Sequence, residues 1–188
     1  KMIKEYYQKR GIKPQSYDAV KPPSYQLGSE TQQINPGKSP RKGREDAPVT
    51  LVVFTDFECI YCSTWAETLD TMLNTFPEEI TIVYKNYPLA YHKQAELAAA
   101  AALAAGEQGK FWEMHDLLFE SLNEWKALST DEFENWVSEQ AEKLDLDGEQ
   151  FSQDLTSQEI VDFARKTWET NSSIGIPGTP FIIINGQP

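Results

Sequence analysis

The feature that most constrains the fold is a pair of cysteines, Cys59 and Cys62, set between two different hydrophobic patterns. Residues 50–55 form a continuous apolar, β-branched run, which favours a strand buried on both faces. After the cysteines, apolar side chains recur along one stripe of a 3.6-residue helix. That stripe consists of Cys62, Trp65, Leu69, Leu73 and Phe76. The cysteine pair is therefore expected where a buried strand gives way to an amphipathic helix.

A second strand is expected soon after this helix. Pro77 ends the helix, because the residue before a proline disfavours the α region. The apolar run at 80–84 then predicts another strand. A strand–helix–strand unit of this length is almost always right-handed, with its two strands parallel. The pattern therefore indicates an α/β fold.

Charge divides the chain into two parts. Residues 1–44 hold ten Lys and Arg against three Asp and Glu, whereas residues 45–188 hold seven against 26. Pro, Gly and Ser are also frequent at 22–44, as in a linker. We therefore expect a basic N-terminal segment and linker over 1–44, followed by one domain over 45–188.

Within that domain, a helical insertion is expected over about 91–172. Two capping-box patterns, Ser129-x-x-Glu132 and Thr156-x-x-Glu159, predict helix starts in it. The apolar run at 181–184 then predicts a third buried strand. It is followed by an Asn-Gly turn of the kind that joins two strands of a hairpin. Since no partner strand follows before Pro188, the fold is expected to be truncated at its C-terminus.

Composition excludes several classes of protein. The 188 residues carry a net charge of −12 and a pI near 4.6, which argues against general nucleic-acid binding. No apolar run approaches the roughly 20 residues of a transmembrane helix, so neither a membrane anchor nor a signal peptide is visible. Two cysteines are too few for a multi-disulfide scaffold or a four-thiolate zinc site.

The two thiols suit thiol–disulfide exchange. Cys59 is expected at the start of the helix, where unpaired backbone N–H groups and the helix dipole favour an anion. It should therefore be partly exposed and more acidic than a free thiol. Cys62 lies on the apolar stripe and should face inward. An accessible thiolate can then form a mixed disulfide, which the sheltered thiol resolves.

Three other interpretations stay open from the residues alone. The cysteines could form a structural disulfide, could be an inert buried pair, or could supply half of a metal site. A metal site would need two further ligands. The only imidazoles are those of His92 and His115, and neither lies at a distance in sequence from the cysteines that is typical of a metal site. No metal is therefore expected. His92 is expected to order a loop, and His115 to be an ordinary helix residue.

Several separated motifs occur in the order typical of one known family. They lie at 46–50, 54–62, 86–89 with His92, 106–112 and 175–181. Through these motifs, residues 36–188 resemble the DsbA-like thiol–disulfide oxidoreductases. The resemblance implies a thioredoxin-like fold with an inserted α-helical subdomain. It also implies that Cys59 is the nucleophile and Cys62 the resolving thiol. Pro180 corresponds to a cis proline of the family, and the backbone of Thr179 to its substrate-binding edge.

The chain departs from the family pattern at two places. Many relatives carry a carboxylate six residues before the first cysteine, where this chain has Val53. Asp56 and Glu58 are candidates to handle the proton in its place, although both could equally be surface charges. Ile60 and Tyr61 are active-site residues between the cysteines, and they lack the histidine of strongly oxidising relatives.

The sequence thus predicts a thiol–disulfide oxidoreductase with a Cys-Ile-Tyr-Cys active site, an oxidant of exported proteins. No metal or organic cofactor is expected, since the Cys59–Cys62 disulfide is itself the redox centre. Expected partners are cysteine-containing protein substrates and an unidentified redox partner, and the expected location is the periplasm or another extracytoplasmic compartment of a bacterium. The alternatives are a disulfide reductase or isomerase, and a non-catalytic binding module on a thioredoxin scaffold.

Overall fold

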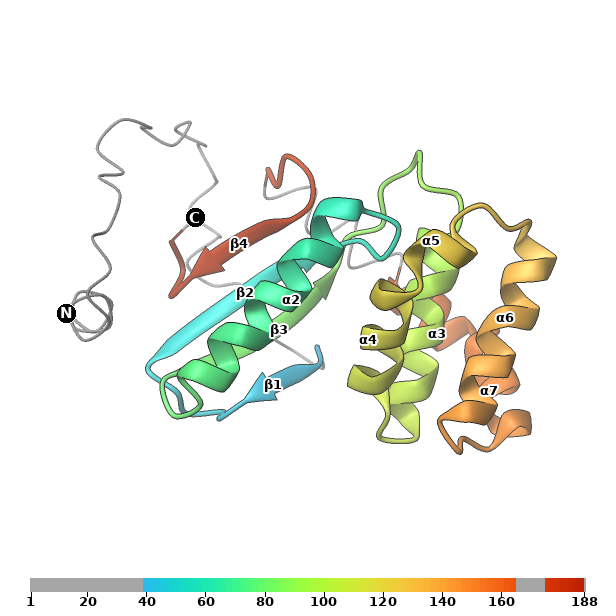
Figure 1. Cartoon of the computed structure of the whole chain (residues 1–188), viewed down its shortest axis with the longest axis horizontal. Coiled ribbons are helices and arrows are strands. Elements are labelled where there is room, and N and C mark those ends of the chain that lie inside the picture. Colours follow the sequence, from blue (N-terminus) through green and yellow to red (C-terminus); the bar gives the residue numbers. More distant parts are fainter. Residues whose placement is uncertain (1–38, 165–174, 188) are drawn as a thin grey trace.

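The computed structural model describes residues 39–164 and 175–187. Those residues form a four-stranded sheet with a group of helices beside it (Figure 1). The strands are β1 (Arg41–Gly43), β2 (Val49–Thr55), β3 (Ile80–Asn86) and β4 (Phe181–Ile184), in the spatial order β1-β3-β2-β4. Residues 1–38 of the basic segment and 165–174 of the expected insertion lie outside the described part.

The central strands confirm the expected parallel unit. β2 and β3 pair in parallel, with Val49 opposite Ile80 and Thr55 opposite Asn86. β1 joins β3 and β4 joins β2, both antiparallel. β2 is buried on both faces because apolar residues fill both sets of alternating positions. Leu51 and Val53 face one apolar cluster, and Val52 and Phe54 face another.

Helix α2 (Ile60–Thr75) covers one face of the sheet. Its Leu69 and Leu73 pack against Leu51 and Val53 of β2. The helix ends before Pro77, as expected. Trp65 differs from the rest of the predicted stripe, because 41% of its surface is exposed. The helix therefore buries its cysteine and leucines while leaving one indole near the surface.

The helical group consists of α3 (Ala95–Glu107), α4 (Phe111–Glu120), α5 (Leu122–Trp125), α6 (Thr130–Lys143) and α7 (Gly148–Leu155). The alanines of α3 are almost all buried, and their small side chains allow other helices to pack closely against them. Trp125 stacks on Phe133 with ring centroids 4.6 Å apart, which anchors α6. Among the described residues, no helix is long and apolar enough to cross a membrane.

One predicted helix start is confirmed and the other is wrong. Ser129 and Glu132 form a complete capping box at the start of α6. Thr156, however, is the C-cap of α7, and its hydroxyl donates back to the Ser152 carbonyl. The next helical residues begin at 158, and the Ser157 hydroxyl accepts the Ile160 N–H instead. The true cap lies one residue after the predicted one.

The two edge strands of the described sheet differ from the sequence expectation. Residues 41–43, expected in the linker, pair with β3 as β1. The strand expected to be buried, β4, buries only Ile183 completely, and Ile184 is 48% exposed. The turn after β4 docks on the start of β2, where the Asn185 side chain accepts the Thr50 N–H and donates to the Pro48 carbonyl. The apolar run indicated a strand but not its place at an edge.

Replacing Gly43 with alanine tests whether β1 is held as closely against β3 as the structure indicates. A Cβ at Gly43 would lie 2.5 Å from the Ile80 carbonyl oxygen, with φ at +95°. Gly109 is a matched control, because its φ is +76° but a Cβ there would meet nothing within 4 Å. We expect Gly109→Ala to cost about 1 kcal/mol and Gly43→Ala about 2 kcal/mol more, because of the clash. Urea unfolding measures both, and equal losses would contradict the close packing of β1.

Candidate active site

Cys59 lies at the junction of β2 and α2, where it is the N-cap of the helix. A short turn holds it there, because the Cys59 N–H donates to the Asp56 carbonyl at 3.1 Å. The Cys59 carbonyl in turn accepts the N–H groups of Cys62 and Ser63 at 3.0 and 3.2 Å. The Cys59 sulfur thus sits over the first turn of the helix, as the sequence predicted.

The surroundings of Cys59 favour its thiolate. A hydrogen bond from the Cys62 thiol lowers the pKa of Cys59 to about 6, against the opposing effect of burial. The backbone N–H groups of Cys62 and Tyr61 lower it further, as does Thr179. Both N–H groups belong to the start of the helix, so the sequence expectation of an acidic first cysteine names one of the causes, while the largest one is the Cys62 thiol.

Cys62 has the opposite character. The hydrogen bond that it gives to Cys59, together with its burial, raises its pKa far above the ordinary thiol value. The Thr55 hydroxyl and the Asp56 backbone oppose this shift only in part. At neutral pH, the Cys62 sulfur of the reduced pair is therefore protonated, and the Cys59 sulfur is a thiolate.

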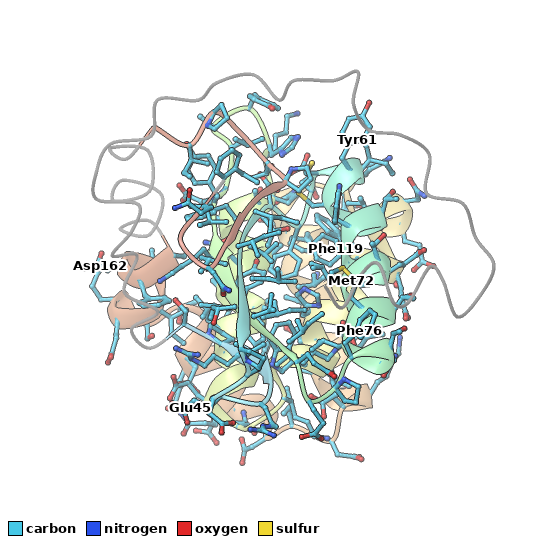
Figure 2. All side chains as sticks on the ribbon, turned by 90° about the vertical axis from the view of Figure 1, so that its left-hand side faces the viewer. Glu45, Tyr61, Met72, Phe76, Phe119 and Asp162 are labelled. Atoms are coloured by element: carbon cyan, nitrogen blue, oxygen red, sulfur yellow. The ribbon has the colours of Figure 1, made fainter. Side chains whose placement is uncertain are left out.

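Access to the two sulfurs is narrower than the sequence suggested. Cys59 was expected to be partly exposed, but only 6% of its surface is accessible, against 1% for Cys62. The backbone at Thr179 accounts for part of this cover, since its carbonyl oxygen lies 3.7 Å from the Cys59 sulfur. The neighbouring Tyr61 is 71% exposed and projects outward from the start of α2 (Figure 2).

The segment before β4 brings Thr179 and Pro180 to the cysteines across more than a hundred residues of chain. The Thr179–Pro180 peptide bond is cis, as the resemblance implied. Pro180 lines the same cavity as Cys62. The backbone of Thr179 therefore lies beside the Cys59 sulfur.

Asp56 is fully buried rather than a surface charge. Its carboxylate accepts the Glu58 and Leu89 N–H groups, each at 2.7 Å, and lies 2.8 Å from Nδ1 of His92. His92 therefore orders its loop, as expected, and does so through Asp56. Glu58 is half-buried, and its carboxylate accepts the Gln94 N–H at 2.8 Å. Both carboxylates fasten the turn before Cys59 to the loop that leads into α3.

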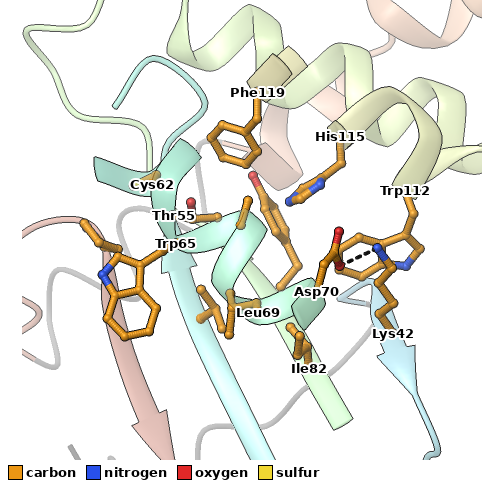
Figure 3. A pocket seen from close by; sticks show the side chains of 14 residues that line it. Lys42, Thr55, Cys62, Trp65, Leu69, Asp70, Ile82, Trp112, His115 and Phe119 are labelled. Atoms are coloured by element: carbon orange, nitrogen blue, oxygen red, sulfur yellow. Dashed lines mark hydrogen bonds and ion pairs between the residues drawn. The ribbon is translucent and has the colours of Figure 1, made fainter. Parts of the chain in front are cut away.

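A small cavity lies behind Cys62, on the side of the helical group (Figure 3). Thr55 and Val53 of β2 line it, together with Tyr84 of β3 and His115 of α4. Sequence reasoning missed Thr55 and Tyr84, although strand alternation places Thr55 on the same face as Val53. His115 was expected to be an ordinary helix residue. It lies near Cys62 because of the way α4 packs, and the spacing of residues in the sequence does not predict this packing.

The described ranges, 39–164 and 175–187, contain no group of three or more His, Cys, Asp and Glu side chains placed to hold a metal ion. The acidic residues nearest the cysteines are already bound to backbone N–H groups.

The acidity of Cys59 can be measured by alkylation of the reduced protein. We expect one thiol per chain to react with iodoacetamide, at a rate that is half-maximal at pH about 6 and falls below it as the thiolate is protonated. The Cys59→Ala variant is the control, since its remaining thiol should stay unreactive over the same range. A midpoint near pH 9, the ordinary thiol value, would contradict this electrostatic account.

Comparison with known proteins identifies relatives of two kinds. The thioredoxin family model matches residues 35–188. The chain is 33% identical over 157 residues to the protein named "Probable disulfide bond formation protein D" of Bacillus anthracis, covering 77% of this chain and 69% of that protein. It is 32% identical over 155 residues to "Na(+)/H(+) antiporter NhaA 3" of Salinispora tropica, covering 82% of this chain and 22% of that protein. The chain spans less than a quarter of the length of the first antiporter relatives.

Among solved structures, a variant of alpha-DsbA1 from Wolbachia pipientis superposes with a TM-score of 0.71 at 17% identity. The superposition covers 84% of this chain and 80% of that chain. This likeness confirms the thioredoxin-like, DsbA-type fold that the sequence motifs implied.

Proposed function

The chain belongs to the thioredoxin family, and from that premise we propose that it is a thiol–disulfide oxidoreductase acting on protein cysteines. The observation that carries the proposal is the unequal pair at the start of α2. Cys59, with a pKa of about 6, is hydrogen-bonded to Cys62, whose pKa is raised. An inert cysteine pair or a structural disulfide does not require two thiols with such different pKa values. In an exchange enzyme, it separates the attacking sulfur from the resolving one.

The proposed reaction runs through a mixed disulfide on Cys59. When the pair is oxidised, a substrate thiolate attacks the Cys59 sulfur, the Cys59–Cys62 bond breaks, and Cys62 takes up the electron pair and a proton. A second substrate thiolate then attacks the substrate sulfur bound to Cys59, and Cys59 leaves as a thiolate. The substrate gains a disulfide and the enzyme gains two thiols, so atoms and electrons balance.

The surroundings of Cys59 support an extended polypeptide as the substrate. The backbone of Thr179 lies beside the sulfur and leads into β4, an edge strand of the described sheet. Ile60, Tyr61 and Trp65 are exposed apolar side chains on the first turns of α2. Backbone hydrogen bonds at Thr179 would bind a substrate peptide whatever its side chains are. The exposed apolar side chains would favour polypeptides that are not yet folded. We assign Asp56 and Glu58 a positioning role, because hydrogen bonds already occupy their carboxylates.

We propose the oxidising direction, toward exported proteins in the periplasm or another extracytoplasmic compartment of a bacterium. Two observations support it: the name of the Bacillus anthracis relative refers to disulfide bond formation, and a Cys59 pKa of about 6 stabilises the reduced enzyme relative to one with an ordinary thiol. An oxidant needs a redox partner that accepts two electrons and restores the Cys59–Cys62 disulfide. It needs no metal or organic cofactor for the exchange itself.

Two assays separate this function from its alternatives. The oxidised chain should restore activity to reduced, denatured ribonuclease faster than an equal concentration of oxidised glutathione does. The second assay follows the reduction of insulin by dithiothreitol, which makes insulin precipitate. The chain should accelerate this precipitation only slightly. Fast insulin reduction with poor ribonuclease recovery would indicate a reductase instead. Failure in both assays would leave a binding module on a thioredoxin scaffold.

A further inference from the structure

Cys62 must change its protonation state in every cycle if the proposed exchange takes place. Its sulfur leaves Cys59 as an anion and becomes a thiol, or follows the reverse course when it resolves a mixed disulfide. Only 1% of Cys62 is accessible to solvent. A sulfur this sheltered cannot exchange its proton with bulk water directly, so it needs a route through the protein.

The cavity behind Cys62 is the place for such a route. Figure 3 shows Cys62, Thr55, His115 and Phe119 around it, on three different elements. Most of its lining is apolar, and its volume is enough for about one water molecule. Val53 of β2 also lines the cavity, and its side chain has no polar group. A proton route here must therefore use other polar groups.

Tyr84 supplies one of them. This residue of β3 lines the cavity. Its hydroxyl is buried and has no hydrogen-bond partner among the described residues. Burial raises its pKa, as do the nearby charges of Asp56 and Cys62, so the hydroxyl keeps its proton. A buried hydroxyl without a partner destabilises the fold, and one bound water removes this penalty.

His115 connects the same cavity to the surface. Its ring lies edge-on to Tyr84 with centroids 5.7 Å apart, and its Nδ1 is 2.7 Å from a carboxylate oxygen of Asp116. The Asp116 side chain is 39% exposed and borders an open groove between α2 and α4. The imidazole thus has the cavity on one side and a solvent-accessible carboxylate on the other.

The titratable groups around this place come from every element that packs there. They are Lys42 of β1, Cys62 and Asp70 of α2, Tyr84 of β3, His115 and Asp116 of α4, and Asp56 through its charge on Tyr84. Lys42 binds Asp70 at 2.7 Å and lies 3.7 Å from Asp116. These three charges form an ion pair network at the outer rim, so His115 is the titratable group between the rim and the sulfur.

We propose that Tyr84 and His115 hold a water molecule in the cavity and that this water carries the proton to and from Cys62. As the Cys59–Cys62 bond breaks, the Cys62 sulfur receives the electron pair and takes a proton from the water. The water is reprotonated from His115, and His115 from solvent at Asp116. When Cys62 instead attacks a mixed disulfide, its proton leaves along the same path. The Cys59–Cys62 disulfide is reduced as the two substrate thiols are oxidised, and the water, Tyr84 and His115 move protons without any change of oxidation state.

The two sulfurs can be followed separately with the aromatic disulfide 5,5′-dithiobis(2-nitrobenzoate). Attack by Cys59 of the reduced protein releases one coloured thiolate, and attack by Cys62 on the mixed disulfide releases a second. We expect Tyr84→Phe to leave the first phase unchanged and to slow the second roughly tenfold at neutral pH, somewhat less than the loss of a direct acid or base. His115→Asn should likewise leave the first phase unchanged and slow the second.

Tyr87→Phe is the matched control, because the Tyr87 hydroxyl is also buried but donates to the Ile176 carbonyl at 3.0 Å, away from the cavity. It should leave the ratio of the two phases unchanged. A normal second phase in both Tyr84→Phe and His115→Asn would overturn the proton route while leaving the proposed function intact. Equal slowing of both phases would also overturn it, since that indicates a general disturbance. Absence of the first phase in the unmodified protein would overturn the proposed function itself.

Discussion

Replacing Cys62 with alanine should leave the chain covalently linked to proteins that contain cysteines, whereas replacing Cys59 should trap none. In the unmodified protein, a Cys59 pKa of about 6 leaves about nine in ten of these sulfurs as thiolate at neutral pH. The Cys62→Ala variant loses the hydrogen bond from the Cys62 thiol, but the backbone N–H groups at the helix start still favour the Cys59 thiolate. Without Cys62, the mixed disulfide on Cys59 loses the sulfur that would release it. Without Cys59, the remaining thiol is buried and protonated, so exchange should fall by several orders of magnitude.

The measurement is non-reducing electrophoresis of each variant after it has been mixed with an oxidised, partly unfolded protein. Complexes that disappear on reduction should form with Cys62→Ala only. The double variant, Cys59→Ala with Cys62→Ala, is the control for non-covalent association. Equal trapping by the two single variants would refute the assignment of nucleophile and resolving thiol.

Replacing Asp56 with asparagine should destabilise the protein by about 3 kcal/mol, because a buried backbone N–H group would lose its charged acceptor. The Asp56 side chain has no exposed surface, and it accepts two backbone N–H groups besides facing His92. An asparagine of the same shape offers one oxygen and one N–H group, so at least one of these donors would lose its acceptor.

Urea unfolding of the reduced protein measures this loss. Asp131→Asn is a matched control, because Asp131 is exposed in the first turn of α6 and its charge interacts mainly with the helix dipole. The control should cost less than about 1 kcal/mol. If Asp56→Asn costs no more than the control, Asp56 does not fasten the turn before Cys59, and its role would have to be sought in proton transfer.

The part of the fold that surrounds Cys59 could be predicted because its pattern is local. The β-branched run of β2 and the apolar stripe of α2 each repeat with their own period, and the cysteines fall between them. Part of the lowering of the Cys59 pKa follows from the same placement, since a helix start is recognisable in the sequence, and the larger part comes from the Cys62 thiol. Ser129 was predictable as a cap for a similar reason, because the capping box is complete within four residues.

The remainder depends on contacts between distant segments. Three residues of β1 are too few to show a period, and their place in the sheet follows from β3 and from the close approach at Gly43. The burial of Asp56 could not be foreseen, because its partners at Leu89 and His92 lie more than thirty residues away. His115 meets the cavity only because α4 packs against the sheet and α2.

The most direct test of exchange at Cys59 mixes the oxidised chain with an equimolar reduced peptide that carries two cysteines, and follows the masses of both. The peptide should lose two hydrogens as the chain gains two, with one peptide disulfide formed for each Cys59–Cys62 disulfide consumed. A peptide that stays reduced, or that is oxidised equally well with the Cys59→Ala variant, would contradict the account.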